Sequence, residues 1–292
     1  MEVIAVPLLI PVKYRRFSYP DGIQPQLQEI AAHFDKESIS PSMPFSLHTE
    51  YSHGKRGWDS PLIQNLPEIC RAKSAVGIPK LWVSREWALE FAVFLSRLCG
   101  NRIPQVIEIH PPFADYSDWP HFFTVYRSFE EKILTQWPDV CLLIENRCGT
   151  LYKSPFLLSK PADFLRLAEG LEKERLRLRI TWDIPQLFSA LKSGSAKMLP
   201  SMDAVADTLP FIDGIHLWGK SGPHRQPHYG DLNTYFRGDP DVKAAFLARL
   251  YDLLADGRPR FFVPEVNSRQ EDLDSIVRDL LQAGFRFAPQ PL

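Results

Sequence analysis

The run Cys141-Leu142-Leu143-Ile144-Glu145 decides the predicted fold, because a short apolar stretch ends abruptly on a charged side chain. Runs this short and apolar are typical of parallel strands that are covered on both faces. In an α/β barrel the carboxyl ends of such strands open onto one face, where functional side chains lie. We therefore predict a strand at 141–145 that brings Glu145 to that face.

The same pattern recurs along the chain, and a helical stretch follows each run. The other predicted strands are 3–10, 45–48, 106–110, 178–183, 212–216 and 261–265, with one more near 33–39. The predicted helix boundaries are Ser84, Pro161, Asp239 and Ser268 at amino-terminal ends, and Gly100, Gly257 and Gly284 at carboxyl-terminal ends. These residue types are favoured at helix caps and first turns.

Alternating strands and helices over the whole length predict an α/β fold, a single (β/α)8 barrel that forms one domain over residues 1–292. A barrel of this kind needs roughly 250 residues, so the length also allows loop insertions. A doubly wound open sheet is the alternative, but no GxGxxG motif follows the first predicted strand. The longest predicted irregular segments, 110–121 and 220–238, both follow strand ends.

Composition and charge exclude some classes of protein. Hydrophobic residues make up 45% of the chain and charged residues 24%, as in ordinary globular domains. The formal net charge is −1, which does not support a generally basic, nucleic-acid-coating surface. A local basic patch beside an active site remains compatible with this charge.

Cysteine usage and the first residues indicate a cytoplasmic protein. None of the 4 cysteines forms a CxxC pair, so a disulfide framework is not predicted and a reducing compartment is expected. The apolar start has no basic residues ahead of it and is interpreted as a strand, not a signal peptide. No apolar run reaches the roughly 18 residues of a membrane span, so no membrane partner is expected.

The polar residues that end the predicted strands form the candidate metal site. They are His48, His110, Glu145, Asp183, His216 and Glu265. Each one taken singly is better explained as a hydrogen-bonded histidine, a helix cap or a surface group. As a set in the same phase of successive units, they predict a divalent cation, which would also relieve repulsion between the carboxylates. Oxygen and imidazole donors together suit zinc, manganese, iron or cobalt.

These strand ends also carry a resemblance. The sequences 143–146 (LIEN), 180–183 (ITWD), 214–216 (GIH) and 263–265 (VPE) resemble the xylose isomerase-like TIM-barrel superfamily, and the resemblance extends over 48–287. That superfamily includes sugar and sugar-phosphate isomerases and epimerases, endonuclease IV and UV-damage endonuclease. The ordered series of motifs is specific for the superfamily and much less so for any one member.

The resemblance implies different roles in its two branches. The epimerase branch implies one metal held by Glu145, Asp183, His216 and Glu265, with both glutamates serving as acid and base. The endonuclease branch implies a second metal on two earlier histidines, with Glu145 as the shared ligand. His48 and His110 match those two positions.

The long loop at 220–238 adds further candidate ligands, and a glutamine at position 186 removes one that the resemblance would imply. In that loop, the resemblance makes His228 and Asp231 candidate ligands of a third site. Both branches usually carry a histidine three residues after the strand aspartate, where this chain has Gln186, so a full three-metal site is not expected. The expected substrate-binding residues are Arg147, Gln186, Lys220, Arg225, Asp231 and Asn267.

The leading functional hypothesis is a divalent-metal-dependent phosphodiester hydrolase that resembles endonuclease IV, in which metal-activated water attacks phosphorus. The substrate would be a phosphodiester, with DNA as one candidate. The alternative is a one-metal sugar or sugar-phosphate isomerase or epimerase in which Glu145 and Glu265 act as acid and base. The third hypothesis is a non-catalytic ligand-binding barrel. The sequence predicts one or two metal ions and no particular oligomeric state.

Overall fold

The strand order of the main sheet identifies the fold. A computed structural model describes residues 5–149, 154–191, 197–222 and 224–289. Its main sheet has the order β10-β7-β6-β5-β4-β3-β2-β1-β11, and β10 also pairs with β1. Parallel strands in this order, with helices after each barrel strand from β3 onward, are those of a (β/α)8 barrel. The predicted fold class is therefore confirmed.

The chain divides into two compact units. Unit 1 comprises Met1–Glu29 and Thr181–Leu292, and unit 2 comprises Ile30–Ile180. The strands β2 (Leu27–Ala32) and β6 (Arg179–Asp183) each have residues in both units. The single domain predicted over residues 1–292 stays a prediction.

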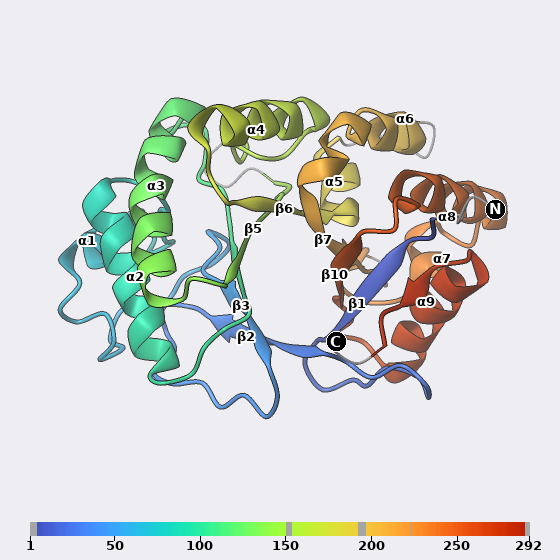
Figure 1. Cartoon of the computed structure of the whole chain (residues 1–292), viewed down its shortest axis with the longest axis horizontal. Coiled ribbons are helices and arrows are strands. Elements are labelled where there is room, and N and C mark those ends of the chain that lie inside the picture. The colour runs from blue at the N-terminus through green and yellow to red at the C-terminus, as the bar shows by residue number, and fades with distance from the viewer. Residues whose placement is uncertain (1–4, 150–153, 192–196, 223, 290–292) are drawn as a thin grey trace. The chain divides into compact units, whose positions relative to one another are not determined.

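Unit 2 contains three neighbouring parallel strands and the helices that follow them (Figure 1). Its strands are β3 (Phe45–Thr49), β4 (Val106–Ile109) and β5 (Cys141–Glu145), and its helices are α1 (Pro67–Arg71), α2 (Arg85–Cys99), α3 (Trp119–Gln136) and α4 (Pro161–Glu174). All residues of β3 and β4 are buried, which explains why these strands are short apolar runs.

An aromatic cluster on α2 and α3 forms the core of unit 2. Phe91 of α2 is 1% exposed, and its ring lies 5.7 Å from that of Trp82 and 5.4 Å from that of Phe129 of α3. Trp82 is fully buried, and its indole nitrogen donates a hydrogen bond of 2.7 Å to the main-chain oxygen of His110. The core of unit 2 is therefore hydrogen-bonded directly to the end of strand β4.

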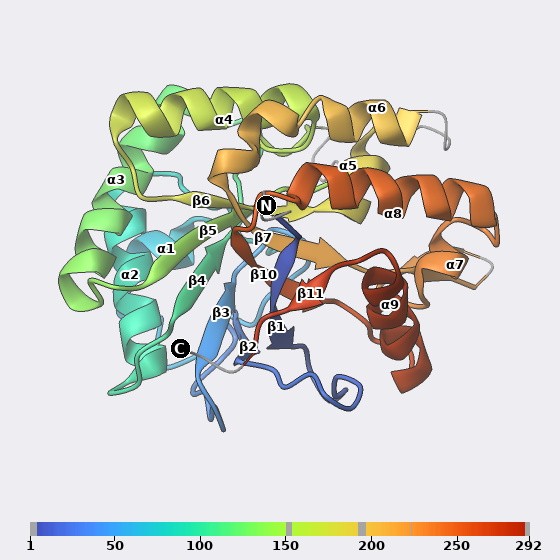
Figure 2. The same ribbon diagram turned by 45° about the vertical axis from the view of Figure 1, so that its right-hand side comes forward.

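Unit 1 holds the first strand of the chain beside its last elements (Figure 2). Its strands are β1 (Leu8–Lys13), β7 (Ile212–Leu217), β8 (Lys220–Ser221), β9 (Gln226–Pro227), β10 (Pro259–Pro264) and β11 (Arg286–Phe287). Its helices are α5 (Ile184–Ala190), α6 (Met198–Asp203), η3 (Ala206–Phe211), α7 (Leu232–Tyr235), α8 (Pro240–Leu254) and α9 (Gln270–Gln282). In Figure 2, α8 and α9 lie to one side of β1, β10 and β11.

Several predicted boundaries are confirmed. The Ser84 and Asp239 side chains accept hydrogen bonds from main-chain nitrogens of the first turns of α2 and α8. Pro161 is the first residue of α4. Helix α2 ends at Gly100, whose φ of 58° is a left-handed value that glycine adopts without strain.

Other predicted boundaries are wrong. The strand expected near 33–39 is β2 at Leu27–Ala32, where Gln28 and Glu29 break the apolar pattern that marks the other strands. The N-cap residue of α9 is Arg269 and not Ser268. The hydroxyl of Ser268 instead donates a hydrogen bond to the carboxylate of Asp272.

The predicted strand 3–10 and the predicted irregular segment 220–238 also differ from the structure. The strand is β1 at Leu8–Lys13, and residues 3 and 4 lie outside the described residues. The segment is not irregular, because it contains the β8–β9 hairpin and α7. Among the described residues, no helix is long and apolar enough to cross a membrane.

The packing of α2 predicts unequal costs for two substitutions on this helix. Phe91→Ala should lower the free energy of unfolding by roughly 3–5 kcal/mol, because it leaves a cavity in the aromatic cluster. Leu89→Ala, at a position 43% exposed, should change it by no more than about 0.5 kcal/mol. Urea unfolding of both variants measures the difference. Equal costs would show that this cluster is not the core of unit 2.

Candidate metal centre

The register of three neighbouring strands brings the candidate residues of unit 2 to one face. His48 on β3 is the Cα partner of Glu108 on β4. Glu108 and His110 point to the same side, because side chains alternate along a strand. Ile109 pairs with Ile144 of β5, so His110 and Glu145, each one residue further along, end neighbouring strands together.

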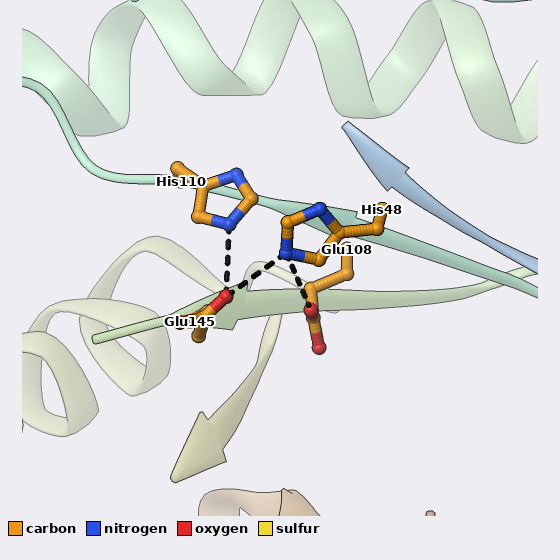
Figure 3. Close-up of side chains that lie close together, drawn as sticks. All are labelled: His48, Glu108, His110 and Glu145. Carbon is orange, nitrogen blue, oxygen red and sulfur yellow. Dashed lines mark hydrogen bonds and ion pairs between the residues drawn. The ribbon is translucent and has the colours of Figure 1, made fainter. Parts of the chain in front are cut away.

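The four side chains point toward one another (Figure 3). The Nε2 atom of His110 lies 2.9 Å from Oε2 of Glu145, and Nε2 of His48 lies 3.3 Å from the same oxygen. The Oε1 atom of Glu108 lies 3.8 Å from Nε2 of His48. One donor atom from each of the four residues lies within 4.8 Å of all the others. The predicted grouping of His48, His110 and Glu145 is therefore seen within unit 2.

Glu145 is a fully buried carboxylate that is held ionised. Burial alone would raise its pKa, but the Arg147 guanidinium and the contacts with His110 and His48 outweigh burial and hold the pKa well below its usual range. The guanidinium Nη1 atom of Arg147 lies 3.2 Å from Oε1 of Glu145. The two oxygens therefore face different partners, Oε1 the guanidinium and Oε2 the imidazoles.

His110 faces an oxygen on each side of its ring. Its Nδ1 atom lies 3.2 Å from the main-chain oxygen of Glu50, and its Nε2 faces Glu145. Burial lowers the pKa of His110 to about 4, so the ring is neutral at pH 7 and carries a single N–H. One of the two contacts is therefore between two lone pairs. A cation between Nε2 and the carboxylate would remove that conflict.

The donor set therefore fits a divalent metal ion. Two imidazoles and two carboxylates, buried and converging, are ligands that zinc, manganese, iron and cobalt share. The Glu50 main-chain oxygen would fix the Nδ1–H tautomer of His110, as partners of metal-bound histidines usually do. Unit 2 thus contains a candidate metal site.

A buried ion pair holds the segment that follows β3. Glu50 is fully buried, and both of its carboxylate oxygens accept hydrogen bonds from Nε of Arg56, at 3.0 and 2.9 Å. The same carboxylate accepts from the main-chain nitrogens of Phe34 and Tyr51. These bonds fix the main chain of Glu50, whose oxygen orients His110.

The ring of Tyr51 contacts both the two histidines of the cluster and two arginine side chains. Its ring centroid lies 5.6 Å from that of His48 and 5.5 Å from that of His110. The guanidinium carbons of Arg56 and Arg147 lie 5.1 and 5.0 Å from the same ring, within the range of cation–π contacts. Arg147, expected to bind substrate, is thus placed beside Glu145 and is 9% exposed.

Unit 1 has its own carboxylate between two histidines. Oε1 of Glu265 lies 3.8 Å from Nδ1 of His216, and Oε2 lies 3.2 Å from Nδ1 of His228. The ring of His228 lies 4.4 Å from that of Trp218. The structure therefore brings His228 next to Glu265, which is necessary if both residues are to bind one metal ion.

Asp183 takes part in two local hydrogen bonds of unit 1. Its Oδ1 accepts from the main-chain nitrogen of Gln186 and thereby caps α5. Its Oδ2 accepts a hydrogen bond of 2.9 Å from the indole nitrogen of Trp218. Asp183 and Glu145 belong to different units, so the predicted four-residue cage and the shared role of Glu145 stay predictions.

The loop after β7 is tied to the end of β10. A Cβ on Gly219 would lie 2.3 Å from main-chain atoms of Gly230, so only glycine allows this approach. The main-chain nitrogen of Asn267 donates to the oxygen of His228 at 2.7 Å, and that of Gly230 donates to the hydroxyl of Ser268 at 3.0 Å. These contacts place His228 beside Glu265.

Asp231 has a structural task in the same loop. It is the N-cap of α7, and its carboxylate accepts hydrogen bonds from the main-chain nitrogen of Thr234, the amide of Asn233 and the hydroxyl of Ser275. Burial would raise its pKa, but these hydrogen bonds outweigh it and lower the pKa. This arrangement favours a capping role, and ligation by Asp231 stays a prediction.

The remaining residues expected at the rim contact their own loop. Nζ of Lys220 donates to the hydroxyl of Ser189 at 2.6 Å and lies 5.4 Å from the ring of Trp218. Nη2 of Arg225 donates to the main-chain oxygen of Tyr235 at 2.7 Å. Substrate binding by Lys220 and Arg225 stays a prediction.

Glu108, Glu50 and Tyr51 were not predicted as residues of the site. Glu108 lies inside an apolar strand two residues before His110, and strand alternation alone assigns both side chains to one face. Glu50 and Tyr51 follow His48 closely in the sequence. Their contacts with Arg56 and Arg147 form only in the folded chain, and the spacing of the residues does not predict them.

Comparisons with known proteins concern the fold. No protein-family model and no curated protein matches the chain. A xylose isomerase domain protein from Alicyclobacillus acidocaldarius subsp. acidocaldarius is 13% identical with a TM-score of 0.40, covering 83% of this chain and 78% of that one. Mannonate dehydratase from Streptococcus suis serotype 2 is 11% identical with a TM-score of 0.44, covering 88% and 94%. The GH53 catalytic domain of Ignisphaera aggregans is 10% identical with a TM-score of 0.41, covering 82% and 73%.

The (β/α)8 strand order comes from the strand pairing of this chain itself and agrees with the predicted fold. Overlaps at this level of identity and TM-score carry no information about activity. The chemistry of the site therefore depends on the contacts within each unit.

The neutral state of His110 can be measured. In metal-free protein, NMR titration of its ring should give a pKa near 4, below the ordinary value of 6.5, because burial disfavours the charged form. The unfolded chain binds this proton more readily, so His110 should reduce stability as pH falls from 6.5 toward 4. A pKa at or above 6.5 would indicate an imidazolium bonded to both oxygens, with no place for a metal on Nε2.

Proposed function

We propose that this protein is a divalent-metal-dependent enzyme that hydrolyses a phosphodiester, with its metal held in unit 2 by His48, His110 and Glu145. The observation that carries the proposal is the approach of two imidazole Nε2 atoms to one oxygen of a fully buried carboxylate. Two imidazoles turned toward one carboxylate can hold the divalent cation that a hydrolytic metal site uses.

The protein residues have separate tasks in this scheme. A bound divalent cation would act as a Lewis acid on a phosphoryl oxygen and make water more acidic. His48, His110 and Glu145 would hold the cation, and Glu50 would orient His110 through its main-chain oxygen. The three ligands come from strands, which fixes their positions more firmly than loops would.

The ionisation of Glu145 favours hydrolysis over isomerisation. An isomerase needs a carboxylate that removes a proton from carbon, and such a base works best when its pKa is near the working pH. The pKa of Glu145 is instead held well below its usual range, despite burial, by Arg147 and the two histidine contacts. A carboxylate of this kind is a weak base and a good ligand for a cation.

The cationic residues of unit 2 favour an anionic substrate. Arg147 lies beside Glu145, and a planar guanidinium can bind two phosphate oxygens at once. Tyr51 packs against the guanidinium groups of both Arg147 and Arg56 and helps to position them. With a net charge of −1, affinity for DNA would have to come from such local groups.

The alternative function is a one-metal sugar or sugar-phosphate isomerase or epimerase. The observation in its favour is Glu265, which lies between His216 and His228 and would serve as its second acid–base group. Assays with abasic DNA, a chromogenic phosphodiester and a panel of ketoses separate the two functions. Turnover of ketoses alone would replace the proposed function with this one.

Glu145→Gln tests the site itself. The variant should lose at least about a hundredfold in phosphodiesterase activity, because it removes a direct ligand of the ion and even indirect partners of metal ligands contribute 10–100-fold. It should keep the far-ultraviolet circular dichroism of the unaltered protein and contain less metal by elemental analysis.

The matched control is Glu130→Gln on α3. Glu130 is another buried glutamate of unit 2, and it is not one of the four residues of the cluster. Its carboxylate accepts hydrogen bonds from the main-chain nitrogen of Arg177. This variant should keep its activity and metal content. Full activity in Glu145→Gln, or a metal-replete preparation that retains no ion, would contradict the proposed function.

A further inference from the structure

Glu108 is the second carboxylate of the candidate metal site, and the proposed function gives it no task. It is 5% exposed and lies on β4 two residues before His110. Its Cα partner on β3 is His48, so the strand pairing fixes its position along the sheet and the face toward which its side chain points. Figure 3 shows its carboxylate turned toward His48 and Glu145.

The distances indicate a shared ligand and not a direct hydrogen bond. The separation of 3.8 Å between Oε1 of Glu108 and Nε2 of His48 is beyond hydrogen-bonding range. Yet donor atoms of His48, Glu108, His110 and Glu145 all lie within 4.8 Å of one another. Four donor atoms at these separations can all bind one ion placed between them.

Charge leads to the same conclusion. Two carboxylates whose oxygens lie within 4.8 Å repel each other unless positive charge separates them. Arg147 contacts Glu145 on its Oε1 side, away from the imidazoles that face Oε2. A cation among the four donor atoms would offset the charge of both carboxylates.

We propose that Glu108 is a fourth ligand of the metal ion and directs the site toward manganese or iron and away from zinc. This inference rests on the proposed function, because it concerns the same ion. The donor set becomes two imidazoles and two carboxylates, all supplied by β3, β4 and β5.

The number of ligands explains the preference for one metal over another. Catalytic zinc sites usually have three protein ligands, and a fourth fills the tetrahedral shell and leaves no position for a substrate. Manganese and ferrous iron accept more ligands, so four protein groups still leave positions open. A second carboxylate oxygen also suits these metals better than zinc.

Calorimetric titration of the metal-free full chain with Mn²⁺ and with Zn²⁺ tests the proposal. Glu108→Gln should weaken Mn²⁺ binding by at least about tenfold, because even indirect partners of metal ligands contribute 10–100-fold. Zn²⁺ binding should weaken less, so the ratio of the two affinities should move toward zinc. Glu130→Gln should bind both ions as the unaltered chain does.

The outcomes separate this proposal from the proposed function. Unchanged Mn²⁺ affinity in Glu108→Gln, together with weakened binding in Glu145→Gln, would overturn the role of Glu108 and leave the metal site standing. Failure of the unaltered chain to bind either ion would overturn both.

A structural measurement covers the case in which Glu108→Gln does not fold. Anomalous diffraction from Mn²⁺-soaked crystals of the unaltered chain should place a Glu108 oxygen roughly 2.0–2.2 Å from the ion, as for carboxylate ligands of related metals. An ion held by His48, His110 and Glu145, with Glu108 turned away, would overturn the proposal.

Discussion

The buried carboxylate of Glu145 imposes the constraint on which the arrangement of unit 2 depends. A charged group with no exposure to water must be compensated by nearby groups, since burial of an isolated charge is very costly. Arg147 supplies a full charge on one side, and two imidazoles face the other. One N–H cannot serve both sides of a neutral His110, so a cation beside Nε2 would complete the set.

The hydrophobic core and the polar site share a direct connection. The indole of Trp82, packed among the rings of α2 and α3, donates to the main-chain oxygen of His110. On the other side, the Glu50–Arg56 pair fixes the main chain that accepts from the ring of His110. His110 is therefore held by apolar packing and by buried charge together, which is the rigidity that a preformed metal site needs.

Sequence patterns predicted the features that repeat and missed those that do not. Short apolar runs found β3, β4 and β5, because these strands are covered on both faces. They missed β2, whose Gln28 and Glu29 break the pattern. Asp183 was predicted as a ligand from its place at a strand end and Asp231 from the family resemblance, and each caps a helix in the structure. A carboxylate before a helix has the same sequence signature in either role.

The sequence by itself indicated the barrel class and placed His48, His110 and Glu145 at the ends of predicted strands. Alternation and burial are local properties, so residue spacing records them. Alternation also assigns Glu108 to the face of His110, but only the tertiary structure decided that its carboxylate approaches the other three donors. The tertiary structure likewise decided that Glu50 orients His110 and that Glu265 lies between His216 and His228. Those contacts depend on strand register and loop packing between residues distant in the chain, which the spacing of residues does not encode.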